Sequence, residues 1–85
     1  MKSKIIYKES VEKDFRRIDH SQRLRIKEKI EHDLANNPHA GKQLKGAYSE
    51  LFSMRVGDYR VIYTFIPDGI LISRVAHRKE VYKLF

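Results

Sequence analysis

The apolar pattern changes its period near residue 51, and this change limits the fold more than any other feature of the chain. Upstream of this point, apolar residues recur at helical spacing. Downstream they alternate with polar residues, as in a half-buried strand, and turn-forming pairs at positions 57–58 and 67–68 divide the segment. We therefore predict a three-stranded antiparallel meander over about residues 51–77, with tight turns between its strands.

Two short helices are predicted before the meander. The first would begin at Ser10, a favourable N-cap residue. The second would begin at Asp19, which with Gln22 has the form of a capping box, and would end near residue 36, before Pro38. Their buried stripes are Val11, Phe15 and Ile18 in the first helix, and Ile26, Ile30 and Leu34 in the second.

A short apolar segment, Ile5 to Tyr7, precedes both helices and is expected to form a strand. The predicted order is therefore βααβββ, an α+β fold in which a helical hairpin packs on a small, mainly antiparallel sheet. The sequence contains no repeat, linker or low-complexity segment, so we expect residues 1–85 to form a single domain.

Size and charge restrict the chemistry that the chain could perform. A core built from 85 residues is too small to enclose a large cofactor, which favours a surface site and a polymer substrate. The formal charge of +7 favours an anionic partner, either nucleic acid or an acidic protein. There is no cysteine and no metal-binding spacing of histidines, so we expect neither metal nor cofactor. The first apolar stretch is too short for a signal peptide or membrane span, and we expect a soluble cytoplasmic protein.

The turn at residues 57–58 predicts which side chains share a face of the meander. If these two residues form the loop, Val56 lies opposite Tyr59 and Arg55 lies opposite Arg60. Directly opposed like charges are unfavourable, and an anion bound between them would remove the repulsion. The opposite face would pack against the helices and would carry Phe52, Met54, Tyr59, Val61, Tyr63 and Phe65. A solvated basic face without function is the alternative interpretation.

The segment AHRKEVY, residues 76–82, adds polar chemistry at the end of the third strand of the meander. That end should lie beside the start of the second strand, so we expect His77, Arg78 and Tyr82 to converge on Arg55 and Arg60. Guanidinium groups stabilise charge on a phosphoryl oxygen, and an imidazole or phenol can move a proton. RNA fits this set because its 2′-hydroxyl supplies the nucleophile. The remaining histidines are expected to be plain surface residues: His20, His32 and His39.

The segments LFSMRVGDYRVIYTF and ILISRVAHRKEVY, with LKG before them, resemble the RelE/ParE toxin superfamily, and its RelE-like branch in particular. The resemblance spans essentially the whole chain and implies the βααβββ fold. It also implies a ribosome-dependent endoribonuclease that cuts mRNA in the A site without metal and leaves a 2′,3′-cyclic phosphate. The implied partners are the ribosome, mRNA and a RelB-like antitoxin, helical and acidic, whose complex with the toxin binds operator DNA.

The resemblance also assigns roles to individual residues. Arg60 matches the arginine that contacts the scissile phosphate, Arg78 matches a second catalytic arginine, and Tyr82 matches a tyrosine that acts as base or stacks on the nucleotide. His77 occupies a position that carries a proton-transferring histidine in several relatives. Further contacts to RNA are expected from the basic residues Arg55, Lys42, Lys45, Arg74 and Lys79.

One departure from the family pattern affects the choice of proton donor. The best-known RelE pattern has alternating lysines on the strand before the arginine, where this chain has Leu51 and Ser53. Two alternatives to RNA cleavage remain at this stage. One is a ParE-like gyrase inhibitor that catalyses nothing, and the other is an inactive relative kept as a DNA-binding or autoregulatory partner. The presence of Arg60, Arg78 and Tyr82 together favours the nuclease.

Overall fold

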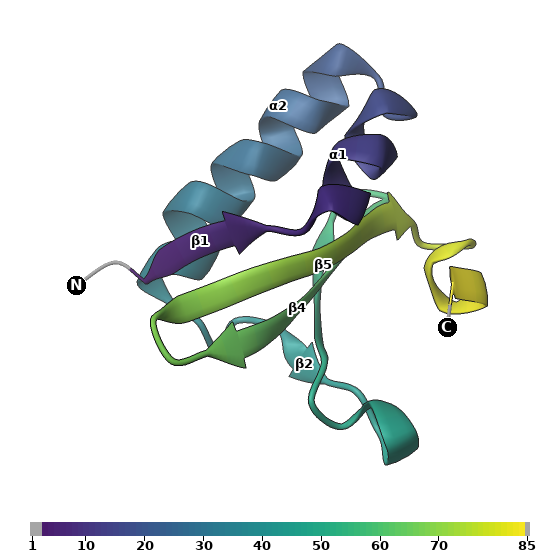
Figure 1. Cartoon of the computed structure of the whole chain (residues 1–85). Coiled ribbons are helices and arrows are strands. Elements are labelled where there is room, and N and C mark those ends of the chain that lie inside the picture. Colours follow the sequence, from purple (N-terminus) through teal and green to yellow (C-terminus); the bar gives the residue numbers. More distant parts are fainter. Residues whose placement is uncertain (1–2, 85) are drawn as a thin grey trace.

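The computed structural model describes residues 3–84, without the side chains of Tyr82 and Leu84, and arranges them as a helical hairpin against a sheet (Figure 1). In chain order the elements are β1 (Lys4–Tyr7), α1 (Glu9–Arg16), α2 (His20–Glu28), the π-helical turn η1 (Lys29–Leu34), β2 (Lys42–Gln43), the 3-10 helix η2 (Gly46–Tyr48), β3 (Phe52–Val56), β4 (Tyr59–Ile66), β5 (Gly69–His77) and the 3-10 helix η3 (Val81–Leu84).

The five strands form one sheet in the order β1-β5-β4-β3-β2. β1 runs parallel to β5, and every other neighbouring pair is antiparallel. The predicted α+β class and the predicted meander are therefore confirmed. The short strand β2 was not predicted, because two residues are too few to show an alternating pattern.

The register of the β3–β4 hairpin agrees with the prediction. Arg55 pairs with Arg60, and Val56 pairs with Tyr59. Gly57 has a φ of 60° in the intervening turn, a conformation that residues with a side chain rarely adopt. A two-residue loop thus determines which side chains lie on each face of the two strands.

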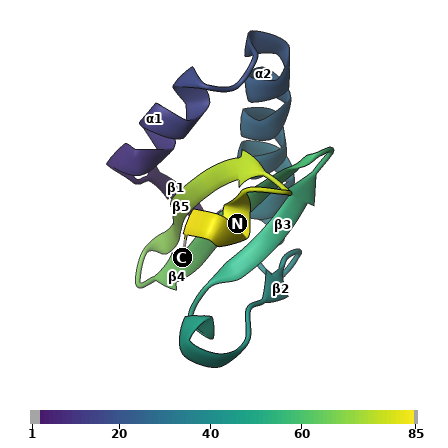
Figure 2. The ribbon, with the colours of Figure 1, turned by 90° about the vertical axis from the view of Figure 1, so that its right-hand side faces the viewer.

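The core lies between the sheet and the two helices, which Figure 2 shows on the same side of the strands. All six apolar residues predicted for the helical stripes are buried. Of the residues predicted for the helix-facing side of the sheet, Met54, Val61 and Tyr63 are buried, and Phe52 and Tyr59 are partly buried against the core. Phe65 is an exception, with 39% of its surface exposed. Its ring lies 5.4 Å from that of His39 and 4.9 Å from that of Phe52, at the margin of the core.

The structure confirms one of the two predicted helix N-caps. Asp19 caps α2 as expected, and its carboxylate accepts a hydrogen bond from the Ser21 backbone N–H at 3.2 Å. The prediction of Ser10 as the N-cap was wrong, because the cap position is two residues earlier, at Lys8, and α1 begins at Glu9. The Ser10 hydroxyl instead donates to the Ser73 carbonyl at 2.9 Å, which joins α1 to β5. In the described part of the chain, no helix is long and apolar enough to cross a membrane.

Buried phenols make the fold sensitive to alkaline pH. The Tyr7 hydroxyl is buried and has no hydrogen-bond partner among the described residues. Burial, and secondarily the charge of Glu31, raise the pKa of Tyr7 from 10.0 to about 12. Burial also raises the pKa of Tyr63, although the Gly41 N–H that donates to its hydroxyl opposes this shift. In both residues the folded state favours the neutral phenol.

We expect the protein to lose stability above pH 10 and the Tyr7→Phe variant to lose less. A group whose pKa is raised on folding contributes stability that is complete below its unfolded pKa, here 10.0, and is lost as the pH rises through about 12. Urea unfolding of both proteins at a series of pH values from neutral to 12 measures the effect. Parallel curves for the two proteins would show that ionisation of Tyr7 does not limit alkaline stability.

Candidate functional site

Arg60 lies on the face of the sheet that is turned away from the helices. Its neighbour in β4, Val61, is fully buried in the core, and successive side chains of a strand point to opposite faces. Arg60 Nη1 donates to the Ser53 hydroxyl at 3.5 Å, and Ser53 is only 3% exposed. Arg60 Nε is buried without a hydrogen-bond partner among the described residues. The guanidinium therefore lies along the sheet with Nε shielded from solvent, and because Arg60 as a whole is only half-buried, an anion on this face could accept from its Nη atoms.

Arg55 shares this face by register but its side chain bends toward the end of the hairpin. Arg55 is exposed, and its Nε donates to the Gly57 carbonyl at 3.0 Å. This contact keeps the Arg55 side chain along the β3–β4 turn. The predicted pairing of Arg55 and Arg60 is confirmed at the level of the backbone, whereas their guanidinium groups have different local partners.

The segment that follows β5 is attached to the same turn. The Arg78 backbone N–H donates to the Asp58 carbonyl at 2.8 Å, and Arg78 Nε lies 4.0 Å from Asp58 Oδ1. About half of the Arg78 side chain is exposed. The expectation that the end of β5 lies beside the start of β4 is thus confirmed, and Arg78 reaches the hairpin that carries Arg55 and Arg60.

His77 lies on the face of the sheet opposite to Arg60, so its predicted convergence on Arg55 and Arg60 is wrong for Arg60 and is confirmed for Arg55, with which it lines a hollow. His77 pairs with Tyr59, and their rings meet edge to face at 5.8 Å. Arg60 pairs instead with Ala76, the preceding residue of β5. Since adjacent residues of a strand point to opposite faces, His77 is turned toward the helices.

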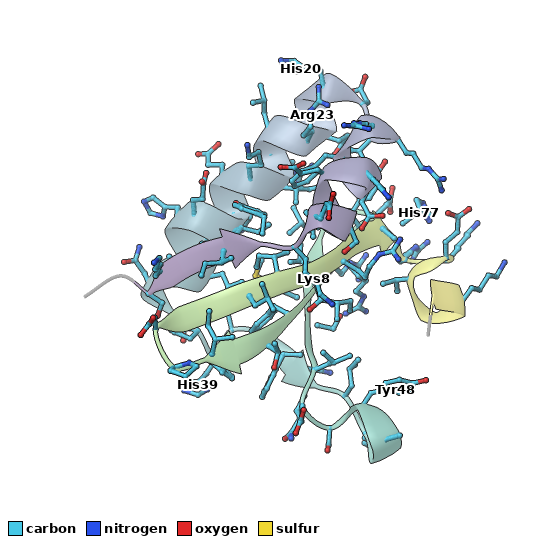
Figure 3. All side chains as sticks on the ribbon, in the orientation of Figure 1. Lys8, His20, Arg23, His39, Tyr48 and His77 are labelled. Carbon is cyan, nitrogen blue, oxygen red and sulfur yellow. The ribbon has the colours of Figure 1, made fainter. Side chains whose placement is uncertain are left out.

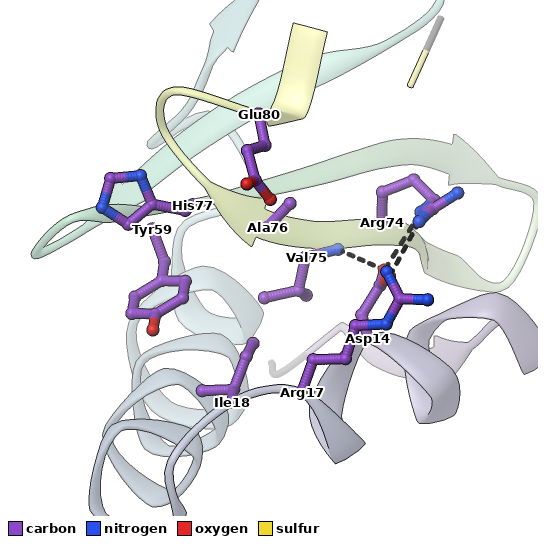
Figure 4. Close-up of a pocket in the computed structure, with 9 residues that line it drawn as sticks. All are labelled: Asp14, Arg17, Ile18, Tyr59, Arg74, Val75, Ala76, His77 and Glu80. Carbon is purple, nitrogen blue, oxygen red and sulfur yellow. Dashed lines mark hydrogen bonds and ion pairs between the residues drawn. The ribbon is translucent and has the colours of Figure 1, made fainter. Parts of the chain in front are cut away.

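An open pocket of about 130 Å³ lies beside His77, between α1 and the end of β5 (Figure 4). It is lined by Asp14, Arg17, Ile18, Tyr59, Arg74, Val75, Ala76, His77 and Glu80. A second hollow lies at the tip of the β3–β4 hairpin, where His77 and Arg55 both contribute and α2 adds Arg25. The contact of Arg25 with the hairpin was not predicted, because the helix periodicity does not indicate which basic residue of the second helix reaches it.

Arg74 is held by a partner inside the fold. Its guanidinium donates two hydrogen bonds to the Asp14 carboxylate, at 3.0 Å from Nε and 2.8 Å from Nη2 (Figure 4). Asp14 is 7% exposed and also accepts from the Val75 N–H at 2.9 Å. Sequence reasoning missed Asp14, although its position on the buried side of α1, between Val11 and Phe15, was a signal for a paired carboxylate. Contact between Arg74 and RNA stays a prediction.

The three candidate lysines occupy separate parts of the surface. Lys42 lies in β2 opposite Ser53, Lys45 precedes η2, and Lys79 follows β5, and all three are exposed. The Lys79 backbone N–H donates to His77 Nδ1 at 3.2 Å. Of the three, only Lys42 is placed by strand pairing on the face that carries Arg60.

The position of Tyr82 is known only for its backbone, which belongs to η3. Its side chain lies outside the described part of the structure, so its predicted role is untested. Val81, the residue before Tyr82, is fully buried outside the core between the sheet and the helices. Ile62 in β4 is also fully buried outside that core. The turn that carries Tyr82 is therefore anchored by an apolar residue beside the end of β5 (Figure 1).

The other three histidines are exposed, as predicted. His20 Nδ1 lies 3.1 Å from Arg23 Nη2, and His32 Nδ1 lies 3.2 Å from Asp33 Oδ1. Figure 3 shows His20, His39 and His77 in separate parts of the molecule. Among the residues with described side chains, no three His, Asp or Glu residues gather in a way that could hold a metal ion.

Comparisons with known proteins agree with this architecture. The family model described as the ParE toxin of the type II toxin–antitoxin system, parDE, matches residues 5–82. Toxin RelE3 of Methanocaldococcus jannaschii is 32% identical over 87 residues, which cover 96% of this chain and 98% of that protein.

Two solved toxin–antitoxin complexes contain chains of the same fold. The RelBE2 complex of Mycobacterium tuberculosis matches with a TM-score of 0.85 and 25% identity, covering 92% of this chain and 93% of that chain. The RelB–RelE complex of Methanococcus jannaschii matches with a TM-score of 0.70 and 26% identity, covering 94% and 98%. The fold and these matches define the class of protein, a toxin of the type II toxin–antitoxin systems. The chain belongs to the RelE/ParE toxin family.

Proposed function

We propose that this toxin is a ribosome-dependent endoribonuclease that cleaves mRNA in the A site. The observation that carries the proposal is the placement of Arg60, whose guanidinium is fixed beside buried Ser53 while its Nε lacks a partner among the described residues. The half-buried guanidinium of Arg60 suits a phosphate on this face whose charge grows during the reaction. Arg78 follows β5 close to the same hairpin and supplies the second cation.

The proposed chemistry uses the RNA as its own nucleophile. The 2′-hydroxyl attacks the adjacent phosphorus, the bond from phosphorus to the 5′ oxygen breaks, and a 2′,3′-cyclic phosphate results. Arg60 and Arg78 stabilise the phosphoryl charge, Tyr82 as the phenolate takes the proton of the 2′-hydroxyl, and the departing 5′ oxygen takes a proton from water. The placement of His77 beside Tyr59, away from Arg60, favours Tyr82 over His77 for this proton transfer.

A cognate antitoxin is the proposed inhibitor of this activity. The similar chains from Mycobacterium tuberculosis and Methanococcus jannaschii were both solved in complexes with antitoxins. In this chain Leu24 on α2 is 54% exposed, and basic residues surround the hairpin tip. A partner with aliphatic and acidic side chains would cover both features and would bind quickly and dissociate slowly. We propose that the pair acts in the cytoplasm, where ribosomes are present, and that the complex binds operator DNA.

The proposal predicts that induced expression of the chain arrests growth by cutting mRNA. Mapping of mRNA 5′ ends after induction should reveal new ends within translated regions, and co-expression of the antitoxin from the neighbouring gene should restore growth. The same cultures should be assayed for gyrase-linked DNA breaks. Such breaks without new mRNA ends would instead support gyrase inhibition, and normal growth at high soluble expression would contradict both activities.

A further inference from the structure

The strand β2 brings one lysine next to the Arg60 site. Lys42 pairs directly with Ser53 across the β2–β3 ladder. Directly paired residues of antiparallel strands project from the same face, with Cβ atoms about 5 Å apart. Ser53 is also the residue whose hydroxyl accepts from Arg60 Nη1. One face of the sheet thus carries Lys42 in β2, Ser53 in β3 and Arg60 in β4, with Arg60 diagonal to Ser53 because Ser53 pairs with Ile62.

This short strand is held in place by a buried phenol. The fully buried Tyr63 donates from its hydroxyl to the Pro38 carbonyl at 2.9 Å and accepts from the Gly41 N–H at 3.0 Å. Gly41 also packs tightly, since a Cβ there would lie 2.5 Å from the Tyr63 hydroxyl and 2.8 Å from the Ser53 carbonyl oxygen. Two ladder residues alone would give an edge strand little stability, and these contacts fix the residue before Lys42.

The ammonium group of Lys42 is available to a ligand. Lys42 is exposed, and no carboxylate of the described residues forms an ion pair with it. The Arg60 guanidinium lies on the same face beyond Ser53, so the face carries cations on both sides of this residue. A phosphate bound in front of Ser53 could accept from both.

We propose that Lys42 is a catalytic residue that contacts the scissile phosphate together with Arg60. This inference rests on the proposed function. As the bond between the 2′ oxygen and phosphorus forms and the bond to the 5′ oxygen breaks, the ammonium donates a hydrogen bond to a non-bridging oxygen and stabilises its growing charge. Lys42 keeps its protons throughout. The 2′-hydroxyl proton passes to Tyr82, and the departing 5′ oxygen takes a proton from water.

The test is single-turnover cleavage of a defined mRNA on programmed ribosomes by four proteins: wild type, Lys42→Ala, Lys42→Arg and Lys4→Ala. Lys42→Ala is expected to slow cleavage at saturating ribosome concentration by a factor on the order of 10². Lys42→Arg should recover most of the rate, because the role requires a cation that donates hydrogen bonds. Lys4 lies in the strand at the opposite edge of the sheet, and Lys4→Ala removes the same charge as a control.

Three results would overturn the proposal for Lys42 while leaving the proposed function intact. They are equal rates for Lys42→Ala and Lys4→Ala, a loss of ribosome affinity in Lys42→Ala with an unchanged rate at saturation, and a Lys42→Arg rate as low as that of Lys42→Ala. A wild-type protein that cleaves no mRNA would instead refute the proposed function, and the proposal for Lys42 with it. Circular dichroism of each variant establishes that it is folded.

Discussion

Replacement of Arg60 by Ala is expected to slow single-turnover cleavage of ribosome-bound mRNA by a factor on the order of 10² or more. The Arg60 side chain is half-buried on the sheet with Nη1 3.5 Å from the Ser53 hydroxyl, and this limits how much it has to be ordered during the reaction. Arg78→Ala is expected to have a similar effect. Affinity for the ribosome should change little, because many Lys and Arg contacts share it and each contributes modestly.

Two further variants make this prediction specific. Arg60→Lys keeps the charge but loses the planar fork, so we expect a rate between those of wild type and Arg60→Ala. Arg16→Ala removes an exposed arginine from the last turn of α1 and is the matched control, with an expected rate near that of wild type. If Arg60→Ala and Arg78→Ala both cleave at the wild-type rate, the catalytic assignment is wrong and gyrase inhibition becomes the better explanation.

Replacement of Asp14 by Ala is expected to lower the free energy of unfolding by about 3 kcal/mol, the effect typical of breaking a buried ion pair from one side. The Asp14 carboxylate accepts two hydrogen bonds from Arg74 and one from the Val75 N–H. Its loss would leave these donors unsatisfied at the point where β5 extends beyond β1, whose last pair is Tyr7 with Ile72. Urea unfolding at neutral pH measures the change.

A double-mutant cycle tests whether the loss comes from the ion pair. Arg74→Met keeps much of the side-chain volume without the charge, and in the Asp14→Ala background it should cost less than it does alone, since its partner is already missing. Strictly additive effects, or a change below about 1 kcal/mol for Asp14→Ala, would show that the pair contributes little to stability.

The meander was predictable from the sequence because its strands and turns depend on residues that are close together in the chain. Alternating residues and a two-residue turn at Gly57 determine both the strands and their register, and the Arg55–Arg60 pairing follows from them. The position of Arg78 beside this hairpin follows from the topology of adjacent antiparallel strands. These parts of the candidate site therefore needed no knowledge of the tertiary packing.

Other parts of the fold and of the candidate site depend on tertiary contacts that sequence patterns do not indicate. The β4–β5 ladder shifts register between Ile62 and Tyr63, which leaves Ser73 unpaired. The core residues of β5 therefore change from Ile70 and Ile72 before the irregularity to Val75 after it, and simple strand alternation does not predict this change. The strand β2 is held by the hydroxyl of Tyr63, a residue 22 positions away from Gly41. Contacts over such distances determine where Lys42 lies, so its pairing with Ser53 was not predicted.

The error over His77 had a different origin, because the sequence did contain the necessary signal. Val75 is an apolar residue of β5 that packs in the core, and strand alternation places His77 on the same side. The end of β5 does lie near Arg60, but His77 projects from the opposite face of the sheet, and the prediction took no account of this direction. Distance along a ladder and direction of a side chain have to be considered together when a site is built across a sheet.

The products of a purified reaction would show whether this toxin cleaves mRNA on the ribosome. The protein is added to programmed ribosomes that hold an end-labelled mRNA, and the fragments are resolved and their termini identified by mass spectrometry. We expect cleavage within the A-site codon, with a 2′,3′-cyclic phosphate on the upstream fragment and a 5′-hydroxyl on the downstream one. Intact mRNA, together with inhibition of DNA supercoiling by purified gyrase at the same protein concentration, would contradict it.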